Sequence, residues 1–351
     1  MKRNVLLTLV CCLVMGVAAL VAAPRTALAI PYHAADSELQ GTAYAVFNPT
    51  TGEFDFVRST ETHSNGDTGT VKSISGGTYT GTTYTGFETN EYNWFCPWDS
   101  NTRNVKSIRF VDAVRPRTTC KWFYGMENCT TMNLSKLDTS QVTDMHSMFE
   151  RCNALTSLDV STFDTSKVTK MYDMFHGSHA LTSLDLSTFD TSQVTSMSDM
   201  FDNCSSLTSL DLSNFDTSKV TGMYEMFKGC SRLTSLDLSH FDTSQVMGGG
   251  MEGMFYDCSS LTSLDLSNFV TSKVIDMFEM FDGCSSLTSL DLSHFDTSKV
   301  TSMSRMFHRC SSLTSLDLSS FDTSKVTSMN GMFDDCRALN KITFGDRFVI
   351  N

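Results

Sequence analysis

Aspartate recurs at one position of the second half of the chain, at a spacing that raises the question of cation binding. If successive copies of the surrounding segment lie side by side, these carboxylates occupy adjacent rungs, where like charges repel. Carboxylate oxygens suit calcium, yet the sequence has neither an EF-hand loop nor a glycine-rich calcium repeat. We therefore expect a solvated face beside serine hydroxyls, with no metal and no cofactor, and calcium stays the open alternative. The column is Asp159, Asp185, Asp211, Asp237, Asp265, Asp291 and Asp317.

A second aspartate column precedes a lysine or glutamine by three residues in each copy. Each aspartate begins an Asp-Thr-Ser segment, whose side-chain oxygens bond nearby backbone N–H groups in turns and helix caps. We predict turn capping with partial charge compensation, and Val270 shows that one copy dispenses with the carboxylate. The column is Asp164, Asp190, Asp216, Asp242, Asp296 and Asp322.

Cysteine marks a third column, in which Met126 and Ser178 occupy the early copies. No Cys-x-x-Cys pair is present, so a structural metal site is not indicated. Alternation with methionine and serine predicts a small buried residue and free thiols. Disulfide formation among Cys96, Cys120 and Cys129 stays open. The column is Cys152, Cys204, Cys230, Cys258, Cys284, Cys310 and Cys336.

The remaining polar residues do not form a catalytic constellation in the sequence. His146, His176, His179 and His308 are expected to be exposed and variable, because no nucleophile and base recur at a fixed spacing. Acidic residues and a histidine of the N-terminal part form no recognisable arrangement either. We expect no enzymatic activity, and a hydrolase in the N-terminal part is the remote alternative. Its candidates are Glu53, Asp55, His63, Asp67 and Glu88.

These columns arise from an internal repeat. A Leu-x-x-Leu-x-Leu segment restarts every 26 residues, except for a step of 28 between Leu233 and Leu261. The two additional residues fall among Met247, Gly248, Gly249 and Gly250, where glycines suit a bulge in a connecting loop. We divide the chain into a signal peptide (1–29), a β-rich capping module (30–128), eight repeats (129–338) and a closing fragment (339–351). The segments begin at Leu155, Leu181, Leu207, Leu233, Leu261, Leu287 and Leu313.

Each copy predicts a strand, a corner and a helical turn. Leu287, Leu290 and Leu292 alternate as in a short strand, and the two methionines and the phenylalanine that follow have the spacing of a short α or 3-10 helix. A single copy cannot bury its apolar face, but stacked copies share one core, which includes the methionine stripe. The predicted fold is an α/β solenoid with a parallel strand ladder and a 26-residue repeat, capped by the N-terminal module.

The unit Leu-Thr-Ser-Leu-Asp-Leu-Ser-x-Phe-Asp-Thr-Ser-Lys-Val-Thr-x-Met-x-x-Met-Phe-x-x-Cys resembles the leucine-rich repeat of BspA-type bacterial surface proteins. The resemblance covers about residues 120–344. Phe163, Phe189 and Phe215 stand where many leucine-rich repeats have a ladder-forming asparagine. Residues 30–119 are similar to the leader module of such proteins, with a hairpin expected around Thr51 and Gly52. The resemblance implies an exported protein displayed at the cell surface for attachment.

The N-terminus has the features of an export signal. Lys2 and Arg3 precede an apolar run, and Ala27, Leu28 and Ala29 form a cleavage site. We expect cleavage after Ala29, with an uncleaved anchor helix as the alternative, and no membrane span in the mature chain. The formal net charge of −13 makes nucleic acid an improbable partner. The mode of attachment to the cell, the completeness of the C-terminus and the oligomeric state stay open.

Binding is expected where the copies differ. Aromatic and arginine side chains beside the repeat methionines are the residue types that anchor protein interfaces. The predicted binding residues are Tyr172, Tyr224, Tyr256, Phe278 and Arg305, together with Asn214, His240 and His294 before the repeat phenylalanine. Burial of Phe278 in the core is the alternative for that residue.

We predict a secreted or surface-displayed adhesin that binds host or bacterial surface proteins or matrix. A passive spacer of the cell envelope, without a specific ligand, is the alternative, because near-identical copies would serve it without any partner.

Overall fold

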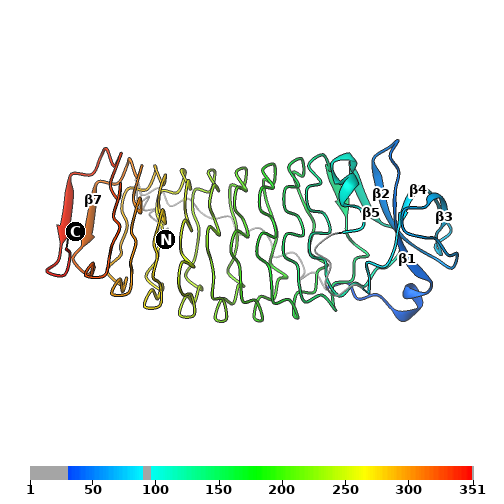
Figure 1. Ribbon diagram of the computed structural model, residues 1–351, viewed down its shortest axis with the longest axis horizontal. Helices are drawn as coiled ribbons and strands as arrows, with labels where there is room; N and C mark the ends of the chain where they lie inside the picture. The colour runs from blue at the N-terminus through cyan, green and yellow to red at the C-terminus, as the bar shows by residue number, and fades with distance from the viewer. Residues whose placement is uncertain (1–30, 90–95, 350–351) are drawn as a thin grey trace, which may run out of the picture.

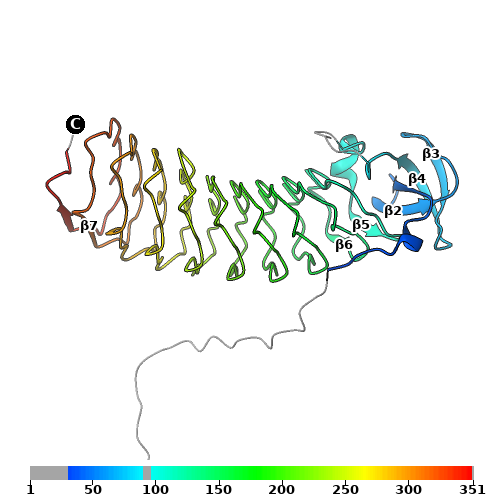
Figure 2. The ribbon, with the colours of Figure 1, turned by 90° about the horizontal axis from the view of Figure 1, so that it is seen from below.

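The computed structural model describes residues 31–89 and 96–349. It is an elongated stack of coils with a β-rich module at one end (Figure 1). Seen from below, the coils follow one another from β6 (Thr131–Asn133) to β7 (Ser315–Leu318) (Figure 2). The predicted signal peptide lies outside the described residues. Among the described residues no helix is long and apolar enough to cross a bilayer.

The N-terminal module is built on a six-stranded sheet of order β3-β4-β1-β2-β5-β6. Its strands are β1 (Thr42–Phe47), β2 (Glu53–Ser59), β3 (Thr68–Lys72), β4 (Thr78–Tyr84), β5 (Ser107–Phe110) and β6 (Thr131–Asn133). Strands β1 and β2 pair antiparallel across the predicted hairpin, and β2, β5 and β6 pair in parallel. The sheet therefore continues from the module into the first coils. Two 3-10 helices, η1 (Asp36–Leu39) and η2 (Asp99–Asn104), complete the module.

One apolar core runs from the module through the stack. In the module, Phe56 stacks on Phe110 with a centroid distance of 4.2 Å, and Trp98 packs edge-on against Phe54 and Phe56. From Phe149 onward, the phenylalanine after the second methionine stacks on its counterpart in the next coil, as Phe175 does on Phe201 at 5.8 Å. Burial of one such side chain contributes roughly 1.5–3 kcal/mol, so this column is a major source of cohesion.

The predicted helical turns are wrong: the helices of the described residues are η1 and η2, both in the module. The residue before each second methionine, such as Asp173 with φ 57°, adopts the left-handed conformation, which interrupts a right-handed helix. Alternate N–H groups then point to the next coil. Met171, Asp173, Phe175 and Gly177 donate to Ser196, Ser198, Met200 and Asp202, at N···O distances of 2.7–3.3 Å. We call this part of each coil the methionine ribbon; it comprises residues 171–178 and their equivalents.

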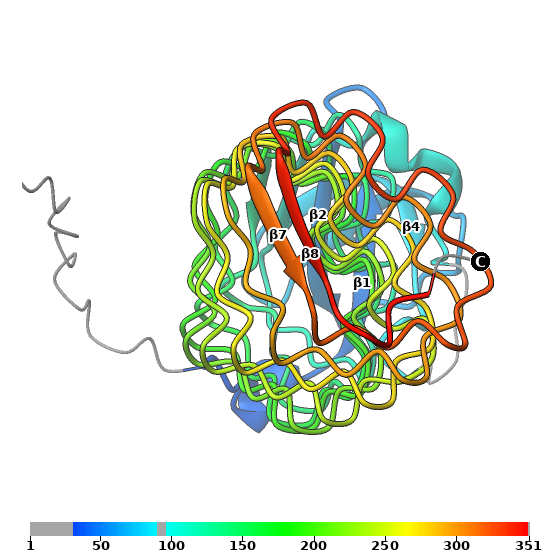
Figure 3. The same cartoon turned by 90° about the vertical axis from the view of Figure 1, so that its left-hand side faces the viewer.

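Among the described residues, the predicted strand ladder of leucine segments is regular at the N-terminal end of the stack, where β6 pairs with β5, and at its C-terminal end, where β7 (Ser315–Leu318) pairs in parallel with β8 (Lys341–Phe344). Strands β7 and β8 lie side by side in the end-on view (Figure 3). In the central coils the leucines are buried, as Leu207 is, but their backbones are joined sparsely, for example by Thr182 N–H to Thr156 O at 3.2 Å. The backbone hydrogen bonds of the methionine ribbon fix the spacing between coils, whereas the leucine segments contact one another mainly through their side chains. The described secondary structure is mostly sheet.

Side-chain hydrogen bonds connect the coils in place of an asparagine ladder. The buried Thr165 Oγ1 donates to Asp190 O at 2.9 Å and accepts from Asp190 N–H at 2.8 Å. The cysteine column has free thiols, as predicted, and Cys204 Sγ donates to Phe175 O at 3.2 Å. Ser178 makes the same bond to Phe149 O at 2.7 Å. Cys96, Cys120 and Cys129 are also free.

Candidate functional site

The most varied column of the stack lies between the two ribbon methionines. Each member of this column precedes a residue in the left-handed conformation, and each from His146 onward directly follows the first of the two methionines, most of which are buried. Its side chain lies at the outer side of the ribbon, and its exposure changes along the stack. Cys120 and His146, at the N-terminal end, are 7% and 5% exposed, whereas Tyr224 and Phe278 are 38% and 37% exposed. We call this set the variable column. It consists of Cys120, His146, Tyr172, Ser198, Tyr224, Glu252, Phe278, Ser304 and Asn330.

Three of the predicted binding residues belong to the variable column. Tyr224 and Phe278 are exposed, so Phe278 is not a core residue. Tyr172 is half-buried, and its ring stacks on that of His146 with a centroid distance of 4.5 Å and an interplanar angle of 14°. His146 is therefore buried, contrary to the expectation that it is an exposed variable residue.

Arg305 and Tyr256 take part in an ion-pair network around the fully buried carboxylate of Asp282. Arg305 Nη1 lies 2.8 Å from Glu279, and Arg305 Nη2 lies 3.0 Å from Asp282. Arg309 also binds Asp282, at 2.8 Å, and its guanidinium stands over the Tyr256 ring. These side chains stabilise the coil contacts, so their presence beside the variable column has a structural cause.

The other predicted residues lie at a different corner, between the leucine segment and the repeat phenylalanine. Asn214 Nδ2 donates to Phe189 O at 2.8 Å and to Leu186 O at 3.1 Å, which ties two coils together. His240 and His294 are exposed at the equivalent position of later coils. The structure therefore divides the predicted binding residues between two surfaces of the stack.

Both aspartate columns cap turns. Asp159 Oδ1 accepts from Ser161 N–H at 3.0 Å, and Asp164 Oδ1 accepts from Ser166 N–H at 3.0 Å. The same bond recurs in later copies, and hydrogen bonds from Ser239 hold the pKa of Asp237 below its usual value. A carboxylate stabilised by an N–H donor needs no cation to offset its neighbours.

A separate acidic cluster lies at the ribbon, where Asp199, Asp202 and Glu225 bring carboxylate oxygens within 4.8 Å of one another. Burial, followed by neighbouring carboxylates, raises the pKa of Asp199 to about 7, and burial raises that of Asp202 to about 6. His176 Nε2 lies 3.3 Å from Asp202, and Lys228 Nζ lies 2.5 Å from Glu225. The oxygen-rich donor set is of the kind that holds calcium, and its cationic neighbours already supply partial compensation.

The candidate hydrolase residues of the module that form contacts do so in separate structural pairs. Asp55 binds Arg109 at 2.7 Å, and Glu88 binds Arg58 through both oxygens. The His63 ring packs edge-on against Tyr44, at a centroid distance of 5.1 Å. These groups support the module's fold.

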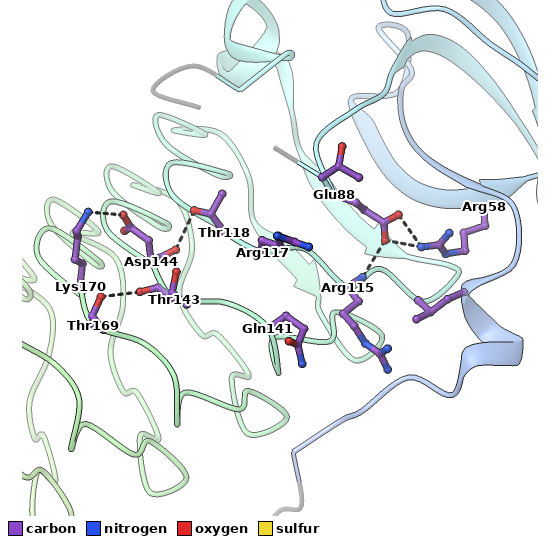
Figure 4. A pocket seen from close by; sticks show the side chains of 12 residues that line it. Arg58, Glu88, Arg115, Arg117, Thr118, Gln141, Thr143, Asp144, Thr169 and Lys170 are labelled. Atoms are coloured by element: carbon purple, nitrogen blue, oxygen red, sulfur yellow. Dashed lines mark hydrogen bonds and ion pairs between the residues drawn. The ribbon is translucent and has the colours of Figure 1, made fainter. Parts of the chain in front are cut away.

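A pocket of about 750 Å³ lies at the junction of the module and the first coils (Figure 4). Arg58, Glu88, Arg115, Thr118, Asp144 and Lys170 are among its lining residues. Arg115 Nε binds the buried Asp138 at 2.7 Å, and Lys170 Nζ binds Asp144 at 3.1 Å. Sequence reasoning missed this site, because its walls come from segments that are far apart in the chain.

The stack of coils with a shared core and inter-coil hydrogen bonds has the architecture of a repeat protein, with buried leucines recurring in each coil. Residues 118–241, 182–289 and 249–344 match a family described as "Mycoplasma protein of unknown function, DUF285". These matches cover more than half of the chain, so the chain belongs to this family of BspA-like repeats. The match confirms the resemblance seen in the sequence.

Two solved structures are similar to the chain. One is a leucine-rich cell surface protein from Faecalibacterium prausnitzii, with 14% identity, a TM-score of 0.27, and coverage of 87% of this chain and 93% of that one. The other is a leucine-rich repeat protein from Bacteroides ovatus, with 17% identity, a TM-score of 0.26, and coverage of 86% and 89%. Among curated proteins no match was found.

Proposed function

We propose that the chain is a surface-displayed or secreted protein whose residues 129–338 form a solenoid of eight 26-residue units, and that it binds a macromolecule through the ribbon side as an adhesin. The observation that carries this proposal is the position of the exposed apolar side chains. Of the eight large hydrophobic residues exposed among the described residues, five lie between Tyr224 and Phe278. A spacer without a ligand has no need of such a concentration.

The apolar side chains replace polar ones at equivalent positions. Met247 and Ile275, 51% and 46% exposed, occupy the slot that is threonine in the other copies from Thr143 to Thr327. Tyr224 and Phe278 occupy the slot of Ser198 and Ser304. We call Tyr224, Met247, Ile275 and Phe278 the apolar patch. It spans the glycine-rich insertion.

Carboxylates surround the apolar patch. Glu225, Glu252, Asp276 and Glu279 are half-buried at the ribbon beside it. Burial and neighbouring carboxylates raise the pKa of Glu252. Lys228 pairs with Glu225 and Arg305 pairs with Glu279, so a partner that covers the patch would direct a cationic group to Glu252 and Asp276, which points to a basic, amphipathic protein segment.

Consensus substitutions test the proposal without disturbing the coil. Replacing the patch by residues that the chain already uses there, Tyr224→Ser, Met247→Thr, Ile275→Thr and Phe278→Ser, should abolish attachment of the mature protein to immobilised matrix proteins or epithelial cells. The matched control is His240→Ser with His294→Ser, which changes the other predicted surface to the residue found at Ser320. Equal attachment by the patch variant, with an unchanged melting temperature, would contradict the proposal and favour the spacer.

A further inference from the structure

The N-terminal end of the variable column holds a thiol, an imidazole and a carboxylate in line. Cys120 Sγ lies 2.9 Å from His146 Nε2, and His146 Nδ1 lies 2.6 Å from Asp144 Oδ1. The other oxygen of Asp144 lies 3.1 Å from Lys170 Nζ. A nucleophile that contacts a base, which is in turn oriented by a third group, is the arrangement that activates thiols.

The stack itself fixes this arrangement. Cys120 and His146 are neighbouring members of the variable column, and the adjacent backbones are joined by Thr119 N–H to Asp144 O and by Lys121 N–H to His146 O, both at 3.1 Å. Asp144 Oδ1 also accepts from His146 N–H at 3.1 Å. With Tyr172 stacked on one face, the imidazole is held in the orientation that presents Nε2 to the sulfur.

The geometry differs from that of a metal site or a structural thiol. The three groups bring ligand atoms within 4.8 Å of one another, but sulfur and carboxylate contact opposite nitrogens of one ring, which is the geometry of a hydrogen-bonded relay. The column thiols, such as Cys152 and Cys204, donate instead to backbone carbonyls and are fully buried. Cys120 is the described cysteine whose sulfur has an imidazole partner.

We propose that Cys120 is a histidine-activated thiol that reacts with small, carboxylate-bearing disulfides entering through the junction pocket. The Cys120 sulfur attacks one sulfur of the disulfide as its proton passes to His146 Nε2. The new S–S bond forms as the old one breaks, and the departing thiolate takes the proton back from His146 and leaves as a thiol. The products are a mixed disulfide on Cys120 and one free small thiol, so atoms and electrons balance.

Electrostatics fits this sequence of steps. Burial raises the pKa of Cys120 to about 12, so the thiol keeps its proton at rest and the base acts only as the sulfur attacks. Burial opposes ionisation of Asp144, but hydrogen bonds from His146 outweigh it and hold the Asp144 pKa below its usual value. The carboxylate therefore stabilises the transient imidazolium.

The lining of the pocket favours an anionic reagent. It shares Thr118 and Asp144 with the thiol site, since Thr118 Oγ1 accepts from Cys120 N–H at 3.1 Å. Four of its lining side chains are cationic, namely Arg58, Arg115, Arg117 and Lys170, against two carboxylates. Asp138 and Asp36 pair with Arg115 from outside the lining, so cations and carboxylates balance at the junction, in a chain whose net charge is −13.

The test uses the full mature protein, oxidised glutathione as the anionic disulfide and cystamine as the cationic one. Mass spectrometry of the cysteine peptides should find Cys120 modified first, and faster by glutathione disulfide than by cystamine. His146→Phe, which keeps a ring for Tyr172 to stack on, should slow the modification by about 100-fold or more, as expected for loss of a general base. His176→Phe removes an imidazole without a thiol partner and should leave the rate unchanged.

Asp144→Asn is the second variant, used in case His146→Phe lowers the melting temperature, and it should also slow the reaction because the amide no longer stabilises an imidazolium. Absence of Cys120 modification in the folded protein overturns the proposal. So does an unchanged rate in the folded His146→Phe or Asp144→Asn protein, or a preference for cystamine.

Discussion

The leucine side and the methionine side of the stack both contain buried side chains but differ in how their backbones are joined. On the methionine ribbon four N–H groups of most coils, from Met171 to Gly177 in one case, donate to the next coil. On the leucine side of the same coils a single bond, from Thr182 to Thr156, takes their place. Apolar burial therefore stabilises both sides, whereas the backbone ladder lies on the methionine side, together with the variable column on which the proposed binding and thiol chemistry rest.

The largest effect is expected from the aromatic column. Phe201→Ala removes a fully buried ring between two stacked neighbours and should lower the free energy of unfolding by about 3–5 kcal/mol. Leu210→Ala, on the leucine side, should cost about 2 kcal/mol because this side chain is already 8% exposed. Urea denaturation followed by circular dichroism measures both. A larger loss for Leu210→Ala would reverse the comparison.

A smaller effect is expected from the threonine ladder. Thr217→Val removes the hydroxyl that donates to Asp242 O at 3.0 Å and accepts from Asp242 N–H at 2.7 Å. It leaves partly buried backbone groups without partners and should cost about 2 kcal/mol in the same assay. Thr208→Val, at an exposed position of the leucine segment, is the matched control and should be nearly neutral. Equal losses would show that the ladder does not set coil cohesion.

The acidic cluster of the ribbon predicts a pH dependence. Burial, followed by neighbouring carboxylates, raises the pKa of Asp199 from 3.8 to about 7, so the folded state binds more protons than the unfolded state between these values. Stability should therefore fall as pH rises from about 4 to about 7. Asp199→Asn, which tolerates the left-handed backbone, should remove about 1 kcal/mol of this decline after allowance for solvent screening.

Asp237→Asn is the control of opposite sign, because hydrogen bonds from Ser239 lower the pKa of Asp237. The stabilisation due to Asp237 is present above its unfolded pKa, near 3.9, and is lost as pH falls through its lower folded pKa. Unfolding curves at pH 3 and pH 5 measure the Asp237 variant, and curves at pH 5 and pH 8 measure the Asp199 variant. A wild-type stability that does not decline between these values would contradict the assignment of Asp199.

The smallest effect is expected in the cysteine column. Cys204→Ser should change the free energy of unfolding by less than about 1 kcal/mol, because Ser178 already makes the equivalent hydrogen bond in the preceding coil. Thermal melting measures the change, and Cys204→Ala serves as the comparison without a donor. A large loss for the serine variant would mean that sulfur packing, rather than the hydrogen bond, determines this position.

Much of the core could be predicted from the sequence, because periodicity reports burial. Leu207, Met200 and Cys204 were placed in the core by their spacing, and the structure buries all three. The conformation between the methionines could not be read in the same way, since a three-residue spacing fits both a helix and the ribbon. His146 was misjudged as exposed because its partners, Cys120 and Tyr172, are each 26 residues away in the chain.

By itself, the amino-acid sequence determined which side chains share a column, because identical spacing in stacked copies places equivalent residues on neighbouring coils. It also determined the family, through the unit that recurs in each copy. Only the tertiary structure decided which side of the coil carries the backbone ladder and that Cys120, His146 and Asp144 meet at the edge of a pocket. Contacts between coils depend on the direction of the backbone N–H groups and on the residues of the neighbouring copy. The spacing of apolar residues within one copy reports neither of them.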